Sequence, residues 1–366
     1  MVVRRLRVRD FRTYASADVA LGAGLTVLHG GNGAGKTNLL EALYFGCTGR
    51  SCRTSDERQV VRFGQGAARV EVEVEGRDGM HDLSVGFQPG EPKRIRVDGM
   101  AVEALATHPS RPLVSVFLPD RLELIKGPPS LRRAHLDQLV AALWPGRAAN
   151  RRAYSQALGQ RNALLGRVRA GAVGRDALQT WDLELARHGI ALRDDRAQAL
   201  DAVADGVAVI AGELGLAGPV ELRYRPRTKA ADAAGLAAEL AERVGSDLER
   251  GFTTHGPHRD DLALLREGRD LRIYGSQGEQ RLGLLALLLA ERGVLEAERG
   301  APPLMLLDDV MSELDADRRG RLIERLRAGG QAVITTTDLA HVPDAEEAGV
   351  ERLAIADGAV LAEVAE

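Results

Sequence analysis

The sequence contains 366 residues, of which 45% are hydrophobic, and it carries a formal net charge of −3. This composition excludes a disordered chain and leaves room for two or three domains. A charge so near zero also excludes a chain that is basic throughout, so any surface for nucleic acid has to be a local patch.

The two cysteines, Cys47 and Cys52, neither make a disulfide framework nor complete a zinc site, and we expect two reduced thiols. The N-terminal segment lacks the apolar core of a signal peptide. The longest uncharged apolar run, Leu282 to Ala290, is far too short to span a membrane. We therefore expect a soluble cytoplasmic protein with no membrane association.

The first 118 residues are predicted to form mainly strands. Short segments rich in Val, Leu and Ile are separated by glycines, and they are LRVRDFRTY, GLTVLHG, ARVEVEVEG, HDLSVGF and KRIRVDG. Val70, Val72 and Val74 alternate with charged residues, which predicts one buried and one solvated face. The later run PLVSVFLP is almost continuously apolar, as in a strand that is covered on both sides.

A helical section of about 130 residues follows, because apolar residues recur there at helical spacing. Examples are Leu136, Leu139, Val140 and Leu143. Strand and helix patterns alternate again from FTTHGPHRDDLALL onward, which is typical of α/β structure. We predict an α/β domain that is split in sequence into residues 1–119 and 251–366, with an α-helical insertion over residues 120–250.

The strongest local motif is GLTVLHGGNGAGKTNLLEAL, in which Gly30, Gly35, Lys36 and Thr37 fit the pattern of a phosphate-binding loop. Glycines let backbone N–H groups surround phosphates, and the N-terminus of the following helix adds partial positive charge. Lys36 is expected to reach the β- and γ-phosphates, and Thr37 to ligate Mg²⁺. The residues expected to bind nucleotide are Gly30, Asn32, Gly33, Ala34, Gly35, Lys36, Thr37 and Asn38.

The segment PLMLLDDVMSELD is an apolar strand that ends in two acids. An acid at the end of a strand beside the phosphate loop can hold Mg²⁺ through Thr37 or water, and we assign this role to Asp308. Asp309 is then placed to orient or deprotonate the attacking water, so Lys36 and Asp309 are the predicted catalytic residues. An alternative stays open for Asp309, in which this acid only caps the next helix.

The order of these motifs resembles that of ABC-type ATPases: a phosphate loop, the Ser-x-Gly turn GSQGEQ, a strand with two acids, and then SELD. In such proteins the Ser-x-Gly turn opens a helix whose positive end faces a γ-phosphate held by a second subunit. The resemblance implies that Ser276 and Gly278 bind ATP in trans, and that Ser312 to Asp315 cross the dimer interface. As local structure, Ser276 and Glu279 also fit a capping box.

Longer segments narrow the resemblance to the RecF family, bacterial recombination mediators related to SMC-type ATPase heads. They are LRVRDFRTY, VSVFLPDRLELIKGPPSLRRAHLD, THGPHRDDL, YGSQGEQR and ITTTD. The resemblance implies an ABC-type P-loop ATPase head with an inserted α-helical domain, a weak DNA-linked ATPase activity, and ATP and Mg²⁺ as cofactors. ATP would drive formation of a homodimer on gapped or junction DNA. This dimer would help RecR and RecO to load RecA, and hydrolysis would release it.

The resemblance also assigns a nucleotide contact to Arg12, and it reveals two departures from the family pattern. The loop after VSVF normally carries a Gln that senses Mg²⁺, but Pro119 and Asp120 stand in that region. The His that usually follows the strand after the two acids is replaced by Thr337, with Asp338 next to it. We therefore expect hydrolysis that is slow or assisted by other groups.

Four basic clusters are candidates for contacts with the DNA backbone: Arg4, Arg5, Arg7 and Arg9; Arg50 and Arg53; Lys126, Arg132 and Arg133; and Arg147, Arg151 and Arg152. For any one cluster, a solvated face of an Arg-rich protein is the simpler interpretation. The segment GPHRDD contains His258, Arg259 and Asp260, and it is either the polar core of the split domain or a loop that faces an interface.

Three other functions stay open at this point. An ABC transporter ATPase subunit would share the fold but would couple to a membrane protein, and the helical insertion and GPHRDDL argue against it. A nucleotide-dependent binding protein would hydrolyse ATP only incidentally. A P-loop kinase would transfer phosphate to an acceptor and would not need Ser276.

Overall fold

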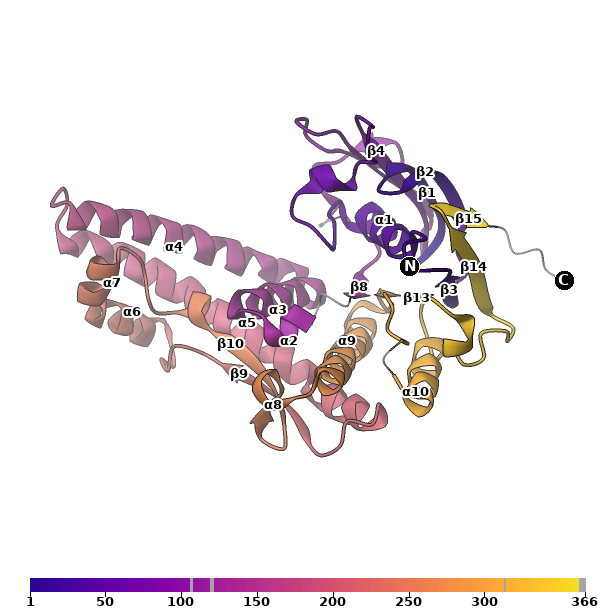
Figure 1. The fold of residues 1–366 in the computed structure, drawn as a ribbon. Helices are drawn as coiled ribbons and strands as arrows, with labels where there is room; N and C mark the ends of the chain where they lie inside the picture. The colour runs from indigo at the N-terminus through magenta and orange to yellow at the C-terminus, as the bar shows by residue number, and fades with distance from the viewer. Residues whose placement is uncertain (106–107, 119–121, 313, 362–366) are drawn as a thin grey trace. The chain divides into compact units, whose positions relative to one another are not determined.

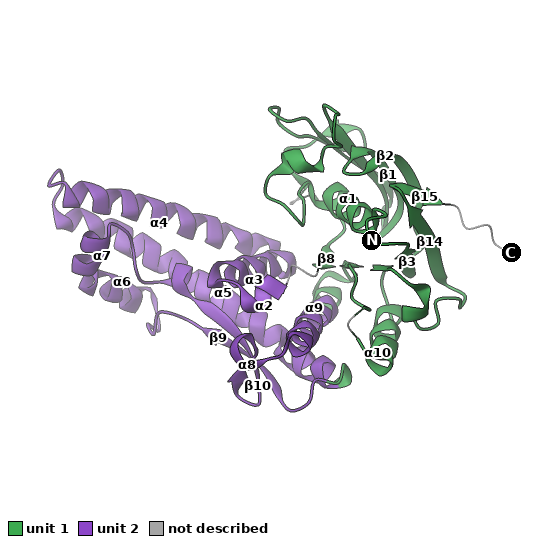
Figure 2. Ribbon diagram, in the orientation of Figure 1, with its two compact units in different colours: residues 1–121, 213–215, 295–366 green, residues 122–212, 216–294 purple. Residues whose placement is uncertain are grey.

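The computed structural model describes residues 1–105, 108–118, 122–312 and 314–361 (Figure 1). The chain forms two compact units, shown in different colours in Figure 2. Unit 1 comprises residues 1–121, 213–215 and 295–366, and unit 2 comprises residues 122–212 and 216–294. The predicted domain boundaries refer to functional parts of the chain, and they stay a prediction. The compact units differ from them in one respect, because residues 251–294 belong to unit 2 with the helical section, whereas we predicted them to be part of the head.

Unit 1 contains a six-stranded sheet whose strand order is β15-β14-β3-β13-β12-β8. Its strands are β3 (Leu25–His29), β8 (Val114–Phe117), β12 (Leu304–Leu307), β13 (Ala332–Thr336), β14 (Val350–Ala356) and β15 (Ala359–Leu361). All neighbouring pairs are parallel except β14 and β15. Strands β12 and β13 are buried at every position, as their apolar sequences predict. The residues that follow β3, β12 and β13 therefore meet at one edge of the sheet.

A second sheet in unit 1 is antiparallel, with the strand order β2-β1-β4-β5-β6-β7. Its strands are β1 (Val2–Phe11), β2 (Tyr14–Ala20), β4 (Ala68–Gly76), β5 (Gly79–Phe87), β6 (Arg94–Val97) and β7 (Met100–Ala101). Val70, Val72 and Val74 are buried, which confirms the predicted alternation. Helix α1 (Lys36–Thr48) contributes apolar side chains to a single core that contains residues of both sheets. Helix α10 (Ala316–Arg327) follows β12.

Unit 2 is mainly helical, which confirms the predicted helical section. Its helices are α2 (Glu123–Lys126), α3 (Pro129–Leu143), α4 (Ala148–Arg169), α5 (Leu178–Glu213), α6 (Ala233–Glu242), α7 (Val244–Arg250), α8 (Leu271–Tyr274) and α9 (Gln277–Arg299), although residue 213 of α5 and residues 295–299 of α9 belong to unit 1. A small antiparallel sheet has the order β11-β10-β9, formed by β9 (Val220–Arg225), β10 (Asp261–Arg266) and β11 (Arg269–Asp270). Within the residues described, no helix combines the length and the apolarity that crossing a membrane requires.

A buried arginine joins three helices of unit 2. The guanidinium of Arg161, on α4, is fully buried and donates hydrogen bonds to Asp182 of α5 at 2.6 Å and to Asp247 of α7 at 2.7 Å. It also donates to the hydroxyl of Thr253 at 2.7 Å. Removing one partner of such a buried pair typically costs about 3–5 kcal/mol, because the other charge stays buried without compensation.

The segment GPHRDD belongs to the polar core of unit 2. Asp260 is fully buried and accepts hydrogen bonds from the hydroxyl of Tyr224 and, at 2.6 Å, from the backbone N–H of Arg227. His258 contacts the hydroxyl of Tyr154 at 2.7 Å and the carbonyl oxygen of Thr253 at 2.9 Å. His258 and Asp260 are therefore polar core residues, but of unit 2 and not of the split domain that the first sequence interpretation named.

Candidate functional site

The phosphate loop connects β3 to α1 in unit 1 and requires glycine at two positions. Gly30 has φ +152°, and a Cβ atom there would lie 2.1 Å from the carbonyl oxygen of Ile355. Gly35 has φ +115° and stands at the N-cap of α1, where no side chain caps the helix. Two hydrogen bonds from outside the loop hold its backbone. The N–H of Gly358 donates to the carbonyl oxygen of Ala34 at 2.9 Å, and the hydroxyl of Tyr14 donates to the carbonyl oxygen of Gly35 at 3.1 Å. The free N–H groups at this helix end suit an anion.

Lys36 is folded back onto its own loop. Its Nζ donates to the carbonyl oxygens of Gly30 at 2.7 Å and Gly31 at 2.8 Å. Burial lowers the pKa of the Lys36 ammonium, and the charges of Asp309 and Asp308 oppose this shift. Asn32 and Gly33 are exposed, while the side chain of Asn38 donates to the hydroxyl of Thr13 at 3.1 Å. An anion on the loop would give the Lys36 ammonium a charged partner in place of two neutral carbonyls.

The first acid lies where the motif predicts it. The hydroxyl of Thr37 is 2.9 Å from each carboxylate oxygen of Asp308, which follows β12. Strand β13 separates β12 from β3, so the acid strand is one strand further from the loop than we expected, yet the two side chains still meet. Burial raises the pKa of Asp308, while hydrogen bonds from Thr335 and Thr37 act in the opposite direction.

The donor set at Thr37 and Asp308 fits Mg²⁺. A hydroxyl and a carboxylate are hard oxygen ligands, and Mg²⁺ commonly uses only one or two protein ligands with phosphate and water oxygens. Across the described ranges, no group of three or more His, Cys, Asp or Glu residues is placed to hold a metal ion. A cation at this position would therefore draw most of its ligands from a nucleotide and from water.

The second acid, Asp309, has an unusual backbone conformation. Its φ is +47°, in the left-handed region, and its N–H donates to the hydroxyl of Thr335 at 2.9 Å. Helix α10 is capped by Asp315, whose carboxylate accepts from the N–H of Arg318 at 2.9 Å. The open alternative, that Asp309 caps this helix, is therefore wrong. Of the SELD segment, Ser312, Leu314 and Asp315 are described.

Arg12 is held by an acid that the sequence interpretation missed. It donates two hydrogen bonds, at 2.9 and 2.7 Å, to Glu41 of α1, whose side chain is fully buried. Glu41 also accepts from Ser51 at 2.5 Å and from Arg53 at 3.3 Å. The signal in the sequence was a glutamate among the apolar residues LLEALYF. The nucleotide contact of Arg12 stays a prediction, and Glu41 fixes where the Arg12 guanidinium lies.

Ser276 forms the capping box that its spacing predicts. Its hydroxyl accepts from the N–H of Glu279 at 3.3 Å, and Glu279 accepts from the N–H of Ser276 at 2.8 Å. The buried Gln280 donates to the carbonyls of Leu271 at 2.8 Å and Gly275 at 3.1 Å, which fixes the turn before α9. Ser276 and Gly278 are exposed. They belong to unit 2 and the phosphate loop to unit 1, so their contact with nucleotide in trans stays a prediction.

The two departures from the family pattern have different outcomes. Pro119 and Asp120 lie outside the described residues. Thr337 is exposed at the end of β13. Asp338 accepts a hydrogen bond from the N–H of Ala340 at 2.9 Å and so caps a short turn of 3₁₀ helix. Both side chains remain near the carboxyl end of β13, although neither replaces the ring of a histidine.

The basic clusters are largely engaged in ion pairs. In the first cluster, Arg4 pairs with Glu75, Arg5 with Asp18 and Arg7 with Glu73. These pairs agree with a solvated face of the antiparallel sheet. The third cluster requires a correction, because Arg132 is 3% exposed and donates to Asp261 at 2.6 Å. It is a structural residue of unit 2 that cannot contact DNA in this conformation.

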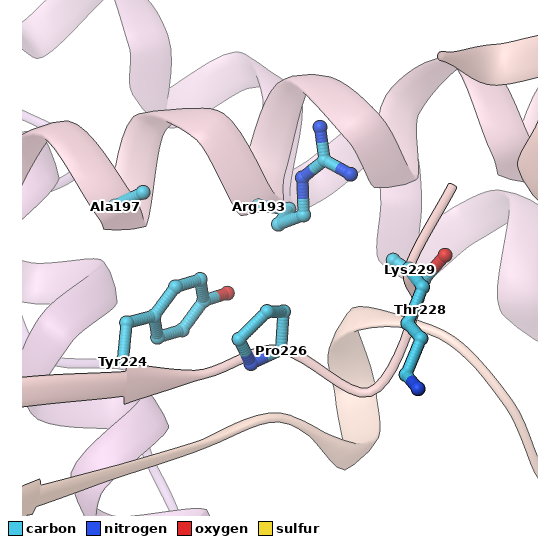
Figure 3. A pocket seen from close by; sticks show the side chains of 6 residues that line it. All are labelled: Arg193, Ala197, Tyr224, Pro226, Thr228 and Lys229. Carbon is cyan, nitrogen blue, oxygen red and sulfur yellow. The ribbon is translucent and has the colours of Figure 1, made fainter. Parts of the chain in front are cut away.

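Unit 2 also contains a hollow of about 540 Å³, lined by Arg193, Ala197, Tyr224, Pro226, Thr228 and Lys229 (Figure 3). The charged ends of Arg193 and Lys229 point away from each other in this view. Arg193 also pairs with Asp194 at 2.7 Å. Because these cations do not converge, the hollow is not built like a phosphate site, and the phosphate loop of unit 1 remains the candidate site.

Comparisons with known proteins identify relatives of this chain. A family model described as an AAA domain matches residues 5–101. The DNA replication and repair protein RecF of Symbiobacterium thermophilum is 37% identical, over 93% of this chain and 92% of that protein. A solved structure of the recombination mediator protein RecF with ATP, in the RecFOR pathway, is 30% identical, covers 99% of this chain and 98% of its own, and has a TM-score of 0.86.

A more distant structure tests the fold alone. An SMC head domain from Pyrococcus furiosus, solved with an extended coiled coil and bound to a domain of ScpA, is 16% identical with a TM-score of 0.57. It covers 98% of this chain and 95% of its own. The predicted fold class, an ABC-type P-loop ATPase head that is split in sequence by a helical insertion, is confirmed.

Proposed function

Because this chain belongs to the RecF family of DNA replication and repair proteins, we propose that it is a DNA repair factor switched by ATP. ATP binding pairs two copies head to head on gapped or junction DNA. The pair helps RecR and RecO to load RecA, and hydrolysis of ATP releases it. The observation that carries the proposal is the contact between Thr37 and Asp308 beside the glycine loop, which brings together residues 271 positions apart.

The residues of unit 1 have separate roles in this switch. The loop N–H groups and Lys36 bind the triphosphate, and Arg12 adds a contact from the turn between β1 and β2. Thr37 and Asp308 hold Mg²⁺, which when bound neutralises charge on the phosphates. Asp309 orients the attacking water or accepts its proton. With Thr337 in place of a histidine, this ATPase is slow.

The second half of each nucleotide site comes from the other copy. The N-terminus of α9 carries partial positive charge, and its exposed Ser276 and Gly278 bind the γ-phosphate of the partner's nucleotide. Two observations support a covered surface here. Ile273 and Tyr274, just before Ser276, are 69% and 68% exposed, and the side chain of Gln280 is hydrogen-bonded to the backbone of the turn that carries them. Large exposed apolar side chains beside polar groups are typical of an interaction surface.

The partners follow from the family and from the local charges. The relative solved with ATP acts in the RecFOR pathway, which supports RecO and RecR as partners. Exposed arginines such as Arg9, Arg50 and Arg152 bind the phosphate backbone of the DNA. Because each phosphate contact releases counterions, this binding weakens steeply as the salt concentration rises.

Light scattering with and without ATP, then with gapped DNA, tests the switch. Wild type is expected to be a monomer without nucleotide and a dimer with ATP.

Lys36→Met removes the charge that binds the phosphates, so ATP no longer induces the dimer and turnover falls by about a hundredfold or more. Asp309→Asn stops hydrolysis after binding, so it accumulates the ATP dimer. A monomeric Asp309→Asn variant at saturating ATP would contradict the proposal.

The trans contact has its own test. Ser276→Arg places a bulky cation at the exposed helix end, where it blocks pairing but leaves ATP binding to the monomer intact. Fluorescent ATP measures binding, and light scattering measures pairing. Loss of monomer binding would show that Ser276 acts within its own chain. Equal turnover in Ser276→Arg and wild type would instead favour a P-loop kinase.

A further inference from the structure

We propose that Thr335 is a positioning residue that fixes both acids of the nucleotide site. It lies in β13, the strand between the phosphate strand β3 and the acid strand β12, and it is fully buried. Its hydroxyl donates to Oδ1 of Asp308 at 2.7 Å and accepts from the N–H of Asp309 at 2.9 Å. No other described hydroxyl is bonded both to the metal-binding acid and to the catalytic acid. The inference rests on the proposed roles of these two acids.

The hydrogen-bonding capacity of a hydroxyl explains how one group can bond to both acids. A threonine hydroxyl has one proton to donate and two lone pairs that accept. The proton is used on Asp308, whose carboxylate also accepts from Thr37, so a lone pair faces Asp309. Threonine is branched at Cβ and is therefore stiff at χ1, and β13 is hydrogen-bonded on both sides. The hydroxyl is thus a fixed point in the sheet.

Asp309 needs such a fixed point because of its backbone. Its φ of +47° lies in the left-handed region, which is less favourable for a residue with a Cβ atom than for glycine, so hydrogen bonds to its backbone help to hold it there. The bond from its N–H to Thr335 is one restraint, and the bond from the hydroxyl of Ser312 to its carbonyl, at 3.1 Å, is another. The direction of the Asp309 carboxylate depends on this backbone. Thr335 therefore acts on the attacking water through Asp309.

Substitution of the hydroxyl tests the inference. Thr335→Val keeps the branched shape and removes both bonds. We expect single-turnover hydrolysis to fall by about tenfold or more, while the Kd for ATP stays within about twofold of wild type. Thr335→Ser restores the hydroxyl and should recover hydrolysis.

The chain offers a matched control in the neighbouring strand. Thr26, in β3, is also fully buried, but its hydroxyl has no hydrogen-bond partner among the described residues. Thr26→Val therefore makes the same chemical change without removing a bond, and it should leave hydrolysis unchanged. If Thr335→Val does not fold, Thr335→Cys replaces it, because a thiol is only a weak donor.

The outcomes separate this inference from the proposed function. Wild-type hydrolysis in Thr335→Val, or an equal loss in Thr335→Ser and Thr335→Val, overturns the inference and leaves the ATP switch intact. If Asp309→Asn hydrolyses like wild type, the assignment of the catalytic acid fails, and the inference fails with it.

Discussion

His258 in unit 2 is a titratable residue used as a fixed hydrogen-bonding group. Its Nε2 faces the carbonyl oxygen of Thr253, so Nε2 carries the proton, and Nδ1 then accepts from the hydroxyl of Tyr154. Burial lowers the pKa of His258 from its ordinary value of 6.5 to about 4, and the nearby charges of Arg259 and Arg133 act in the same direction. The neutral ring is therefore part of the folded state.

This pKa predicts how stability depends on pH. Between pH 6.5 and 4 the unfolded chain binds a proton that the folded chain excludes, so the stabilisation present above pH 6.5 is lost as the pH falls. The loss is at most about 3 kcal/mol. Urea unfolding of wild type and His258→Gln at pH 7.5 and 5 measures it. The variant should lose less stability on acidification, and equal losses would exclude His258 as the titrating group.

Single residues differ in how far the sequence predicts their roles. Lys36 and Thr37 were predictable because a loop of fixed spacing brings its own residues together. Asp308 was predictable from its place at the end of an apolar strand. Glu41 and Thr335 were missed, because no sequence motif pairs them with Arg12 and Asp308, which lie 29 and 27 residues away. Those contacts depend on strand order, which no local pattern contains.

At the scale of elements, the close approach of α1 to β4 depends on one glycine. A Cβ atom at Gly46 would lie 2.4 Å from Cγ2 of Val72 and 2.9 Å from Cγ1 of Val70. Both valines are buried in the core of unit 1, so they have little room to move. Gly46 therefore sets the distance between the helix that begins at the phosphate loop and the antiparallel sheet.

Gly46→Ala should destabilise unit 1 by about 1–3 kcal/mol through overpacking. Gly159, in α4, is the matched control, because nothing lies within 4 Å of a Cβ atom there. Gly159→Ala should stabilise its helix by about 0.5–1 kcal/mol. Thermal unfolding of both variants checks the two signs. A neutral or stabilising Gly46→Ala would mean that α1 can move away from the sheet at little cost.

The sequence predicted which segments form strands better than it predicted the position of each strand in its sheet. Alternating valines identified β4, and continuous apolar runs identified β12 and β13. The run VSVF was expected to be covered on both sides, but β8 is an edge strand in which Val114 and Ser115 are only half-buried. An apolar run cannot distinguish the edge of a parallel sheet from its centre, since helices cover both faces of either strand.

At the scale of the molecule, the compact units follow the first predicted domain boundary more closely than the second, and the boundaries themselves stay a prediction. Compact unit 1 first ends at residue 121, near the predicted 119, but residues 251–294 pack in unit 2. The reason is that β10 pairs with β9, which precedes the predicted boundary, over six residues. The α/β texture after residue 251 was identified correctly. A change of texture does not show with which part of the chain a strand pairs.

A mixing experiment tests the paired assembly as a whole. Lys36→Met and Ser276→Arg should each be inactive alone. In a mixed pair, one site combines both defects, and the other combines an intact loop with an intact Ser276. Random pairing should therefore restore up to about a quarter of wild-type turnover. ATPase assays of the mixture over a range of ratios measure it. No recovery would mean that both residues serve the nucleotide of their own chain.

The position of β3 in its sheet has a consequence for biosynthesis. This strand is translated early, yet both of its neighbours, β13 and β14, are among the last segments to leave the ribosome. Gln331 makes a second connection between the early and late parts of the chain. Its side-chain amide accepts a hydrogen bond from the N–H of Val3 at 2.8 Å and donates one to the carbonyl oxygen of Val3 at 2.7 Å. All of unit 2 is translated in between, so it can fold on the nascent chain before unit 1 is complete. Premature termination just before β14 would therefore release a polypeptide whose phosphate-loop strand has one unsatisfied edge, which chaperones and proteases can recognise.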